Sequence, residues 1–222
     1  MVPTALGPAS ISHVHARSAP CIRALGILLF IAMSTRIAAI ALIVSVVFFR
    51  VALALAGPAF SGYAPLAALV LGAAVLLPQA RFAWLPAAAF LASDILLNVV
   101  VYKTGAFQSF LWVTLGFYVL LFLGGRGLSR LQSLALPFLG SAAAAAVAFH
   151  VVANTASWMA DPLYAKTMAG WVQANTTGVP GFPPAWLFLV KSLAGNLAFA
   201  GLFLVALAPM RRSLPATVEA RA

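Results

Sequence analysis

The chain has 222 residues, of which 64% are hydrophobic and 7% are charged, and its formal net charge is +10. A soluble domain of this size could not remove so much apolar surface from water, so the composition predicts an integral membrane protein. Nucleic-acid binding is not expected, because the 13 Lys and Arg residues are scattered between apolar runs and form no basic face. The single cysteine, Cys21, excludes an internal disulfide, and no metal-binding motif is present.

Residues 1–32 allow three interpretations. Residues 1–23 are expected to be disordered, and the nine apolar residues at 24–32 are too few to span a membrane. Basic residues before a short apolar core are typical of a signal peptide, although no small-residue cleavage site follows. Alternatively, residues 1–32 are a non-native extension and translation starts at Met33, which would give a short basic start followed directly by a span.

Six apolar runs approach the length of about 20 residues that a spanning helix needs. They lie at residues 37–56, 64–77, 82–102, 107–123, 132–153 and 185–210, and the second is short. We therefore expect an all-α membrane protein, in which residues 33–210 form one bundle of about six transmembrane helices and residues 211–222 form a cytoplasmic tail. The short second run and residues 24–32 leave five or seven spans as alternatives.

The basic residues alternate between loops as six spans require. One side carries Arg36, Arg81, Arg126, Arg130, Arg211 and Arg212, whereas the other carries only Lys103 and Lys166. Cytoplasmic loops have an excess of Lys and Arg, so both termini are expected in the cytoplasm, with the protein in a bacterial inner membrane.

The longest predicted loop, residues 154–184, would then lie outside. Asp161 suits an N-cap and Pro162 suits the first position of a helix, so residues 161–174 predict a short interfacial helix. Three tryptophans would form an aromatic belt at the outer surface or, alternatively, contact a ligand: Trp158, Trp171 and Trp186.

Two rows of small residues at four-residue spacing predict close contacts between helices in lipid. The first row is Ala64, Ala68 and Gly72, and the second is Gly140, Ala144 and Ala148.

Asp94 is the one acidic residue inside a predicted span, and other charged residues lie at a similar depth. At a rise of about 1.5 Å per residue, Asp94 is roughly 13 Å below the outer end of its helix, and Arg50 and Lys191 are each roughly 10 Å below theirs. Asn98 lies one turn from Asp94. A charge inside the membrane is costly, so it normally faces the interior of the bundle and is paired.

Two hypotheses follow from this layer. In the first, a pocket open to the outside captures a small polar or anionic solute, and its lining comprises Arg50, Asp94, Asn98, Lys191 and Asn196. Asn154, one turn from His150, lies near the pocket, and Trp158 and Tyr164 would cap it. In the second, Asp94 pairs with Arg50 or Lys191 and only holds helices together, as in a non-transporting scaffold or assembly factor.

Neither hypothesis requires a cofactor. An enzyme is not expected, because the sequence has no second buried carboxylate for acid–base catalysis and no nucleophile–base arrangement. His150 is expected to form a hydrogen-bonded contact between helices, with a proton relay as the alternative.

Several segments resemble an uncharacterised family of small bacterial membrane proteins that are described as transport proteins. The resemblance covers residues 33–210, and its most specific elements are Ser93–Asp94, the stretch from Asn154 to Trp158, and Gly195–Asn196. The family often has Gly-Asp in the sixth span, whereas this chain has an amide there.

That family is in turn similar to the S components of energy-coupling-factor vitamin transporters. These are six-helix proteins with an outward-facing pocket that borrow ATPases through a separate membrane subunit. To the two partners already expected from composition and from the polar layer, the lipid bilayer and a small solute, the resemblance adds an energising membrane subunit.

Overall fold

The computed structural model describes residues 37, 40–41, 43–45, 47–60, 62–107 and 110–212. The chain divides into two compact units, Met1–Ala38 and Ala39–Ala222, and the second unit contains the helices described below. The predictions for residues 1–32 and for Met33 lie outside the described residues, as does the tail beyond Arg212.

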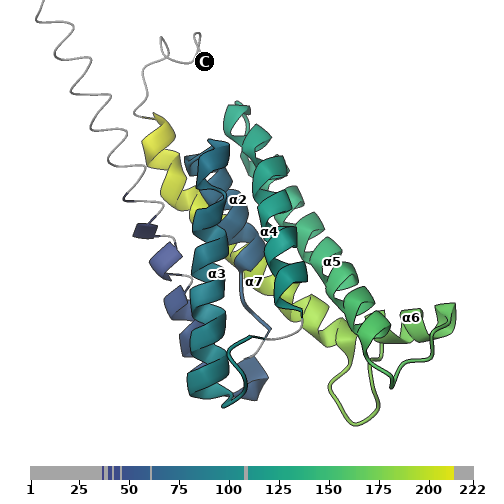
Figure 1. The fold of residues 1–222 in the computed structure, drawn as a ribbon. Coiled ribbons are helices and arrows are strands. Elements are labelled where there is room, and N and C mark those ends of the chain that lie inside the picture. The colour runs from purple at the N-terminus through teal and green to yellow at the C-terminus, as the bar shows by residue number, and fades with distance from the viewer. Residues whose placement is uncertain are drawn as a thin grey trace, which may run out of the picture. The chain divides into compact units, whose positions relative to one another are not determined.

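The described part of the second unit consists of helices and contains no strand (Figure 1). The main helices are Ile43–Leu55, α2 (Leu66–Leu76), α3 (Trp84–Leu96), α4 (Leu111–Gly125), α5 (Ala135–Ala160), α6 (Met168–Asn175) and α7 (Ala185–Arg212). Short turns of 3-10 or π-helix adjoin them at η2 (Pro58–Phe60), η3 (Ala80–Phe82), η4 (Leu97–Val101) and η5 (Arg126–Arg130).

Within the described residues, four helical stretches are long and apolar enough to cross a membrane: Ala80–Val101, Leu111–Arg130, Ala135–Ala160 and Ala185–Ala208. Large apolar side chains lie on the outside of the bundle, such as Leu136 and Trp112, which are 80% and 77% exposed. Such a surface is stable against lipid and not against water. The prediction of an all-α membrane protein is therefore confirmed. Of the six predicted spans, four have the required length, and Ile43–Leu55 and Leu66–Leu76 are shorter apolar helices.

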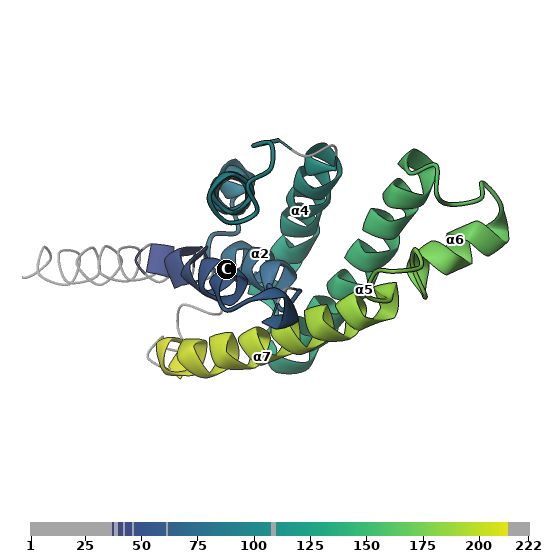
Figure 2. The ribbon, with the colours of Figure 1, turned by 90° about the horizontal axis from the view of Figure 1, so that it is seen from below.

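The short helix α2 lies in the centre of the bundle. It contacts α3, α4, α5 and α7, and every residue from Leu66 to Ala74 is buried. Figure 2, in which the helices of Figure 1 are seen from below, shows α2 between α4 and α7. A helix that is apolar on all sides is expected to be surrounded by protein, which explains why this run shows no polar face.

Two apolar clusters hold the helices around α2. The first joins α2 to α3 and α4 and includes Leu69, Phe90 and Phe122. The second joins α2 to α5 and α7, where the rings of Phe138 and Phe203 stack at a centroid distance of 5.0 Å.

One predicted row of small residues packs inside the bundle and the other does not. Ala68 and Gly72 of the first row are buried, so α7 can approach α2 closely. Gly140, Ala144 and Ala148 are all exposed, so the second prediction is wrong. The buried face of α5 instead contains Phe138, Ala142, Ala145, Ala146 and His150, because this face turns toward α2 and α7.

The predicted bounds at the end of α5 are also wrong. Residues 154–160 continue the helix, and the Asp161 backbone N–H donates to the Ser157 carbonyl to close it. The Asp161 carboxylate accepts from the Leu163 N–H at 2.9 Å, which turns the chain instead of starting a helix. The short helix is present as α6 but begins at Met168, where the Thr167 hydroxyl accepts from the Gly170 N–H.

The turns after α2 and α4 are joined to each other and are rich in arginine. The Arg126 side chain donates to the Pro78 carbonyl and so joins the turn after α4 to the turn after α2. These turns contain Arg81, Arg126 and Arg130. α6 lies toward the opposite end from the yellow C-terminal end of α7 (Figure 1).

Candidate functional site

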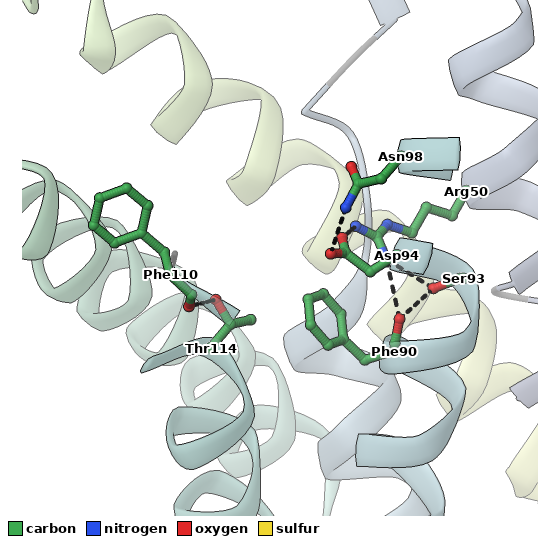
Figure 3. Close-up of polar contacts among 7 residues, drawn as sticks. All are labelled: Arg50, Phe90, Ser93, Asp94, Asn98, Phe110 and Thr114. Atoms are coloured by element: carbon green, nitrogen blue, oxygen red, sulfur yellow. Dashed lines mark hydrogen bonds and ion pairs between the residues drawn. The ribbon is translucent and has the colours of Figure 1, made fainter. Parts of the chain in front are cut away.

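Arg50 and Asp94 form an ion pair between the helix Ile43–Leu55 and α3 (Figure 3). The Arg50 Nη2 atom lies 2.7 Å from Asp94 Oδ1, and Nη1 donates to the Ser93 hydroxyl, also at 2.7 Å. The Asn98 amide donates to the second carboxylate oxygen of Asp94 at 3.1 Å. We call these four residues the Arg50–Asp94 cluster.

The backbone of α3 and of the turn that follows it explains why the side chains of Asp94 and Asn98 meet. Asp94 and Asn98 are four residues apart and therefore lie on one face of the helix. The α-helix ends at Leu96, and Asn98 lies in the π-helical turn Leu97–Val101 that continues it. The backbone N–H of Thr104 donates to the Asn98 carbonyl at 2.8 Å, which ties the following loop to this turn.

The Arg50–Asp94 cluster is mostly shielded and electrically balanced. The side chains of Arg50 and Asp94 are 16% and 18% exposed, and each oxygen of the carboxylate accepts a hydrogen bond. The guanidinium carbon of Arg50 also lies 4.9 Å from the centre of the Phe90 ring. Charge-assisted pairs of this kind fix the geometry between two helices.

A cavity of about 310 Å³ lies on the other side of an aromatic wall, between α2, α4, α5 and α7. Phe90, which contacts Arg50, packs edge-on against Tyr118, and Tyr118 stacks on Phe149. Tyr118 and Phe149 line the cavity, whereas Arg50, Ser93, Asp94 and Asn98 do not. The single pocket predicted from the sequence is therefore divided into a charged cluster and a separate cavity.

The cavity lies at the end of the bundle where α2 and α7 begin. Its lining includes Gly62 and Ala64 of the preceding loop, Leu66 at the start of α2 and Phe188 near the start of α7. Its polar side chains come from three helices: Tyr118 of α4, His150 and Asn154 of α5, and Ser192 and Asn196 of α7.

His150 and Asn154 connect the cavity to α6. The His150 Nε2 atom lies 2.9 Å from the carbonyl oxygen of Asn175, which can only accept, so Nε2 carries the proton. Nδ1 of the neutral ring then accepts from the Asn154 amide at 3.1 Å. The same amide donates to the His150 carbonyl at 2.8 Å, and these contacts orient Asn154.

Asn196 caps the buried end of α2 from a different helix. Its side-chain oxygen accepts from the Ala68 backbone N–H at 2.8 Å, and its amide donates to the carbonyl of Ser192. The first N–H groups of a helix have no partner within the helix, and Pro65 provides no side-chain cap. Asn196 therefore supplies the helix cap that the residues directly before α2 do not provide.

Lys191 lies at the rim of the cavity. Its Nζ atom donates to the Ala59 carbonyl at 2.9 Å and lies 5.7 Å from the centre of the Tyr63 ring. A Cβ atom placed on Gly62, which lines the cavity, would meet the stem of Lys191 at 3.4 Å. Lys191 thus holds the loop before α2 and makes no contact with Asp94 in the described residues.

Trp158 lies in the last turn of α5, Tyr164 lies in the connection between α5 and α6, and neither side chain lines the cavity. The Trp158 indole donates to the Ala165 carbonyl at 2.8 Å, and Lys166 donates to the Trp158 carbonyl. Burial, with a smaller contribution from Asp161, raises the pKa of Tyr164 above its ordinary value, so the phenol is neutral at physiological pH. The hydrogen bonds of Trp158 and Lys166 stabilise this connection, and the Trp171 indole of α6 also donates to the Thr155 hydroxyl of α5.

A comparison of the whole sequence with known families decides its membership. The profile of a family of unknown function (DUF6580) matches residues 24–217. The chain belongs to the DUF6580 family. The match begins before Met33, so it extends beyond the range of the resemblance seen in the sequence. No curated protein and no solved structure matches the chain.

Of the residues predicted for the site in this DUF6580 member, only Asn154 and Asn196 line the cavity. Arg50, Asp94 and Asn98 lie together in the charged cluster. Sequence reasoning did not identify Tyr118, Phe149, Phe188 and Ser192 as lining residues. Ser192 had one signal, since it lies one helical turn before Asn196, but the aromatic residues resemble any other apolar residue of a span.

Proposed function

We propose that this protein is a membrane-embedded binding component that captures a small solute in the cavity between α2, α4, α5 and α7. The observation that carries the proposal is the cavity itself, with about 310 Å³ of space and polar side chains from three different helices. Small-molecule sites are typically concave, mostly apolar and equipped with a few convergent polar groups. Their volumes range from about 300 to 1,000 Å³, so this cavity suits a small ligand.

The proposed side of capture is the outer side of a bacterial inner membrane, with both termini in the cytoplasm. The cavity lies toward the loop before α2 and the start of α7. Arg81 lies in the turn that follows α2, and Arg126 and Arg130 lie in the turn that follows α4. An excess of Arg and Lys is typical of the cytoplasmic side, which supports this orientation.

The solute would be bound without a contact to Arg50 or Lys191, the two basic residues that the sequence predicted for the pocket. Arg50 is neutralised by Asp94 at 2.7 Å, and Lys191 donates to a backbone carbonyl of the neighbouring loop. The proposal therefore assigns binding to Tyr118, Asn154 and Ser192, with His150 and Asn196 holding the surrounding helices. Transport across the membrane would require an energising subunit, as the resemblance to S components suggests.

The test is mass spectrometry of small molecules released from the detergent-purified protein. Ala153 lines the cavity and is half-buried, so Ala153→Leu should reduce its volume and remove a bound compound. Ala148→Leu is the matched control, because Ala148 is exposed on the same helix. A compound found with the wild type and Ala148→Leu but lost from a folded Ala153→Leu protein is the expected result. A compound retained equally by all three would contradict the proposed site.

A scaffold or assembly factor remains the second candidate, favoured by the Arg50–Asp94 cluster. Both oxygens of the Asp94 carboxylate are engaged by neighbouring helices or by its own helix, which is what a purely structural ion pair requires. This candidate gains support if no compound depends on Ala153 and if other membrane proteins co-purify stoichiometrically.

A further inference from the structure

We infer that the solute is an uncharged, ring-containing compound that both donates and accepts hydrogen bonds; this inference rests on the proposed binding function. Among the described residues, the side chains that line the cavity include no Asp, Glu, Lys or Arg. A charge moved from water into such surroundings would lose its hydration without gaining a counter-charge, which is strongly unfavourable.

The charged groups nearest to the cavity are already occupied. Arg50 and Asp94 neutralise each other behind Phe90 and Tyr118, and the guanidinium also donates to Ser93. Lys191 is fixed at the rim by the Ala59 carbonyl and the Tyr63 ring. A charged ligand would therefore have to break one of these contacts, whereas an uncharged ligand would not.

The hydrogen-bonding groups left for a ligand are neutral and few. The nitrogen of the Asn154 amide is engaged by His150, which leaves its oxygen as an acceptor among the described residues. The Ser192 hydroxyl oxygen receives a hydrogen bond from Asn196 at 3.3 Å, which leaves its own proton as a donor. One acceptor on α5 and one donor on α7 suit an amide, a lactam or a similar neutral group.

The remaining surface of the cavity favours a flat ring. Tyr118 and Phe149 stack at 5.5 Å with an angle of 19° between their planes, and Phe188 contributes a third aromatic side chain from α7. Aromatic side chains pack with ring ligands in offset or edge-on arrangements that add to the effect of burial. A neutral ring compound would use both the aromatic and the amide parts of the lining.

Three probes of equal size and different charge test the inference on the full-length protein: para-fluorobenzamide, para-fluorobenzoate and para-fluorobenzylammonium. Binding is measured from the fluorine NMR linewidth of each probe with the wild type, Ala153→Leu and the control Ala148→Leu. Subtracting the signal of Ala153→Leu removes partition into the detergent. We expect the benzamide to bind the wild type and Ala148→Leu about tenfold more tightly than either ion, because the ions have no counter-charge.

The outcomes separate the inference from the function on which it rests. If benzoate or benzylammonium binds as tightly as benzamide and depends on Ala153, the site stands but the inference of an uncharged solute is wrong. If none of the three probes binds in an Ala153-dependent manner, the inference of a neutral ring compound fails. The compound released from the purified protein then decides independently whether the proposed function also fails.

Discussion

Asp94 and Asn196 are both polar residues inside apolar helices, and each satisfies a different requirement. Asp94 compensates the charge of Arg50 and holds α3 to the helix Ile43–Leu55. Asn196 accepts the backbone N–H of Ala68 and holds α7 to the beginning of α2. Neither residue therefore needs a ligand to explain its position, whereas Asn154 and Ser192 offer the cavity hydrogen-bonding groups that no other described residue engages.

Removing the charge of Asp94 should destabilise the fold. In Asp94→Asn, Arg50 loses its counter-charge inside the bundle, and the loss should be about 1.5–3 kcal/mol, the range for hydrogen bonds to charged groups. The double variant Arg50→Asp with Asp94→Arg should recover part of this loss. Thermal unfolding in one detergent compares them, with Asp161→Asn as a control in which an amide oxygen can still accept from Leu163. Equal unfolding temperatures for all variants would refute a stabilising ion pair.

The cap that Asn196 supplies to α2 gives a second prediction. Asn196→Leu leaves the Ala68 N–H without a partner in a buried position and should cost about 1–2 kcal/mol of stability. Asn196→Asp in its neutral form keeps an acceptor for the Ala68 N–H and a donor for the Ser192 carbonyl, so it should retain most of the stability. The same unfolding measurement checks both, and a leucine variant as stable as the aspartate variant would show that the cap is unimportant.

At the scale of the helices, the apolar runs predicted the elements well and their ends poorly. Runs of apolar residues fix which segments are helical, because an unsatisfied backbone is too costly in lipid. The end of α5 was misplaced because Asn154 resembles a loop residue, yet its amide donates to His150 within the helix. Asp161 resembles an N-cap, yet it follows the last residue of α5 and accepts from Leu163 at the start of the next turn.

The sequence predicted the charged part of the site but not the cavity. The pairing of Asp94 with Arg50 is one of the two alternatives that charge and depth suggested, and the contacts select it over Lys191. The cavity depends on which aromatic faces of α4, α5 and α7 turn inward, and helices that are apolar on all sides carry no periodic signal for this.

The contact between α7 and the loop before α2 depends on Gly195. A Cβ atom at this position would lie 2.3 Å from the Tyr63 carbonyl oxygen, so the loop would have to move. Gly195→Ala should therefore cost about 1–3 kcal/mol, the usual range for overpacking, and should weaken ligand binding at the adjoining rim. Gly201→Ala is the matched control, because a Cβ there meets nothing within 4 Å. If both alanine variants unfold at the same temperature, the close approach of Tyr63 is not maintained in solution.

At the scale of the whole molecule, the distribution of charge predicts how the bundle lies in the membrane. Thr177 follows α6 and Gln132 follows η5, and both are exposed. In a Cys21→Ser background, Thr177→Cys should react with an impermeant maleimide in intact spheroplasts, whereas Gln132→Cys should react only after lysis. The reverse pattern would invert the proposed orientation and place the cavity toward the cytoplasm.

The central claim is that the Arg50–Asp94 cluster stabilises the fold whereas the cavity binds the solute. One paired measurement tests it most directly. The unfolding temperature and the affinity for para-fluorobenzamide are measured together for the wild type, Asp94→Asn and Ala153→Leu. We predict that Asp94→Asn unfolds at a lower temperature but binds the probe as the wild type does, whereas Ala153→Leu stays folded and loses binding. An Asp94→Asn protein that is as stable as the wild type but no longer binds the probe would contradict the account and return the site to the charged cluster.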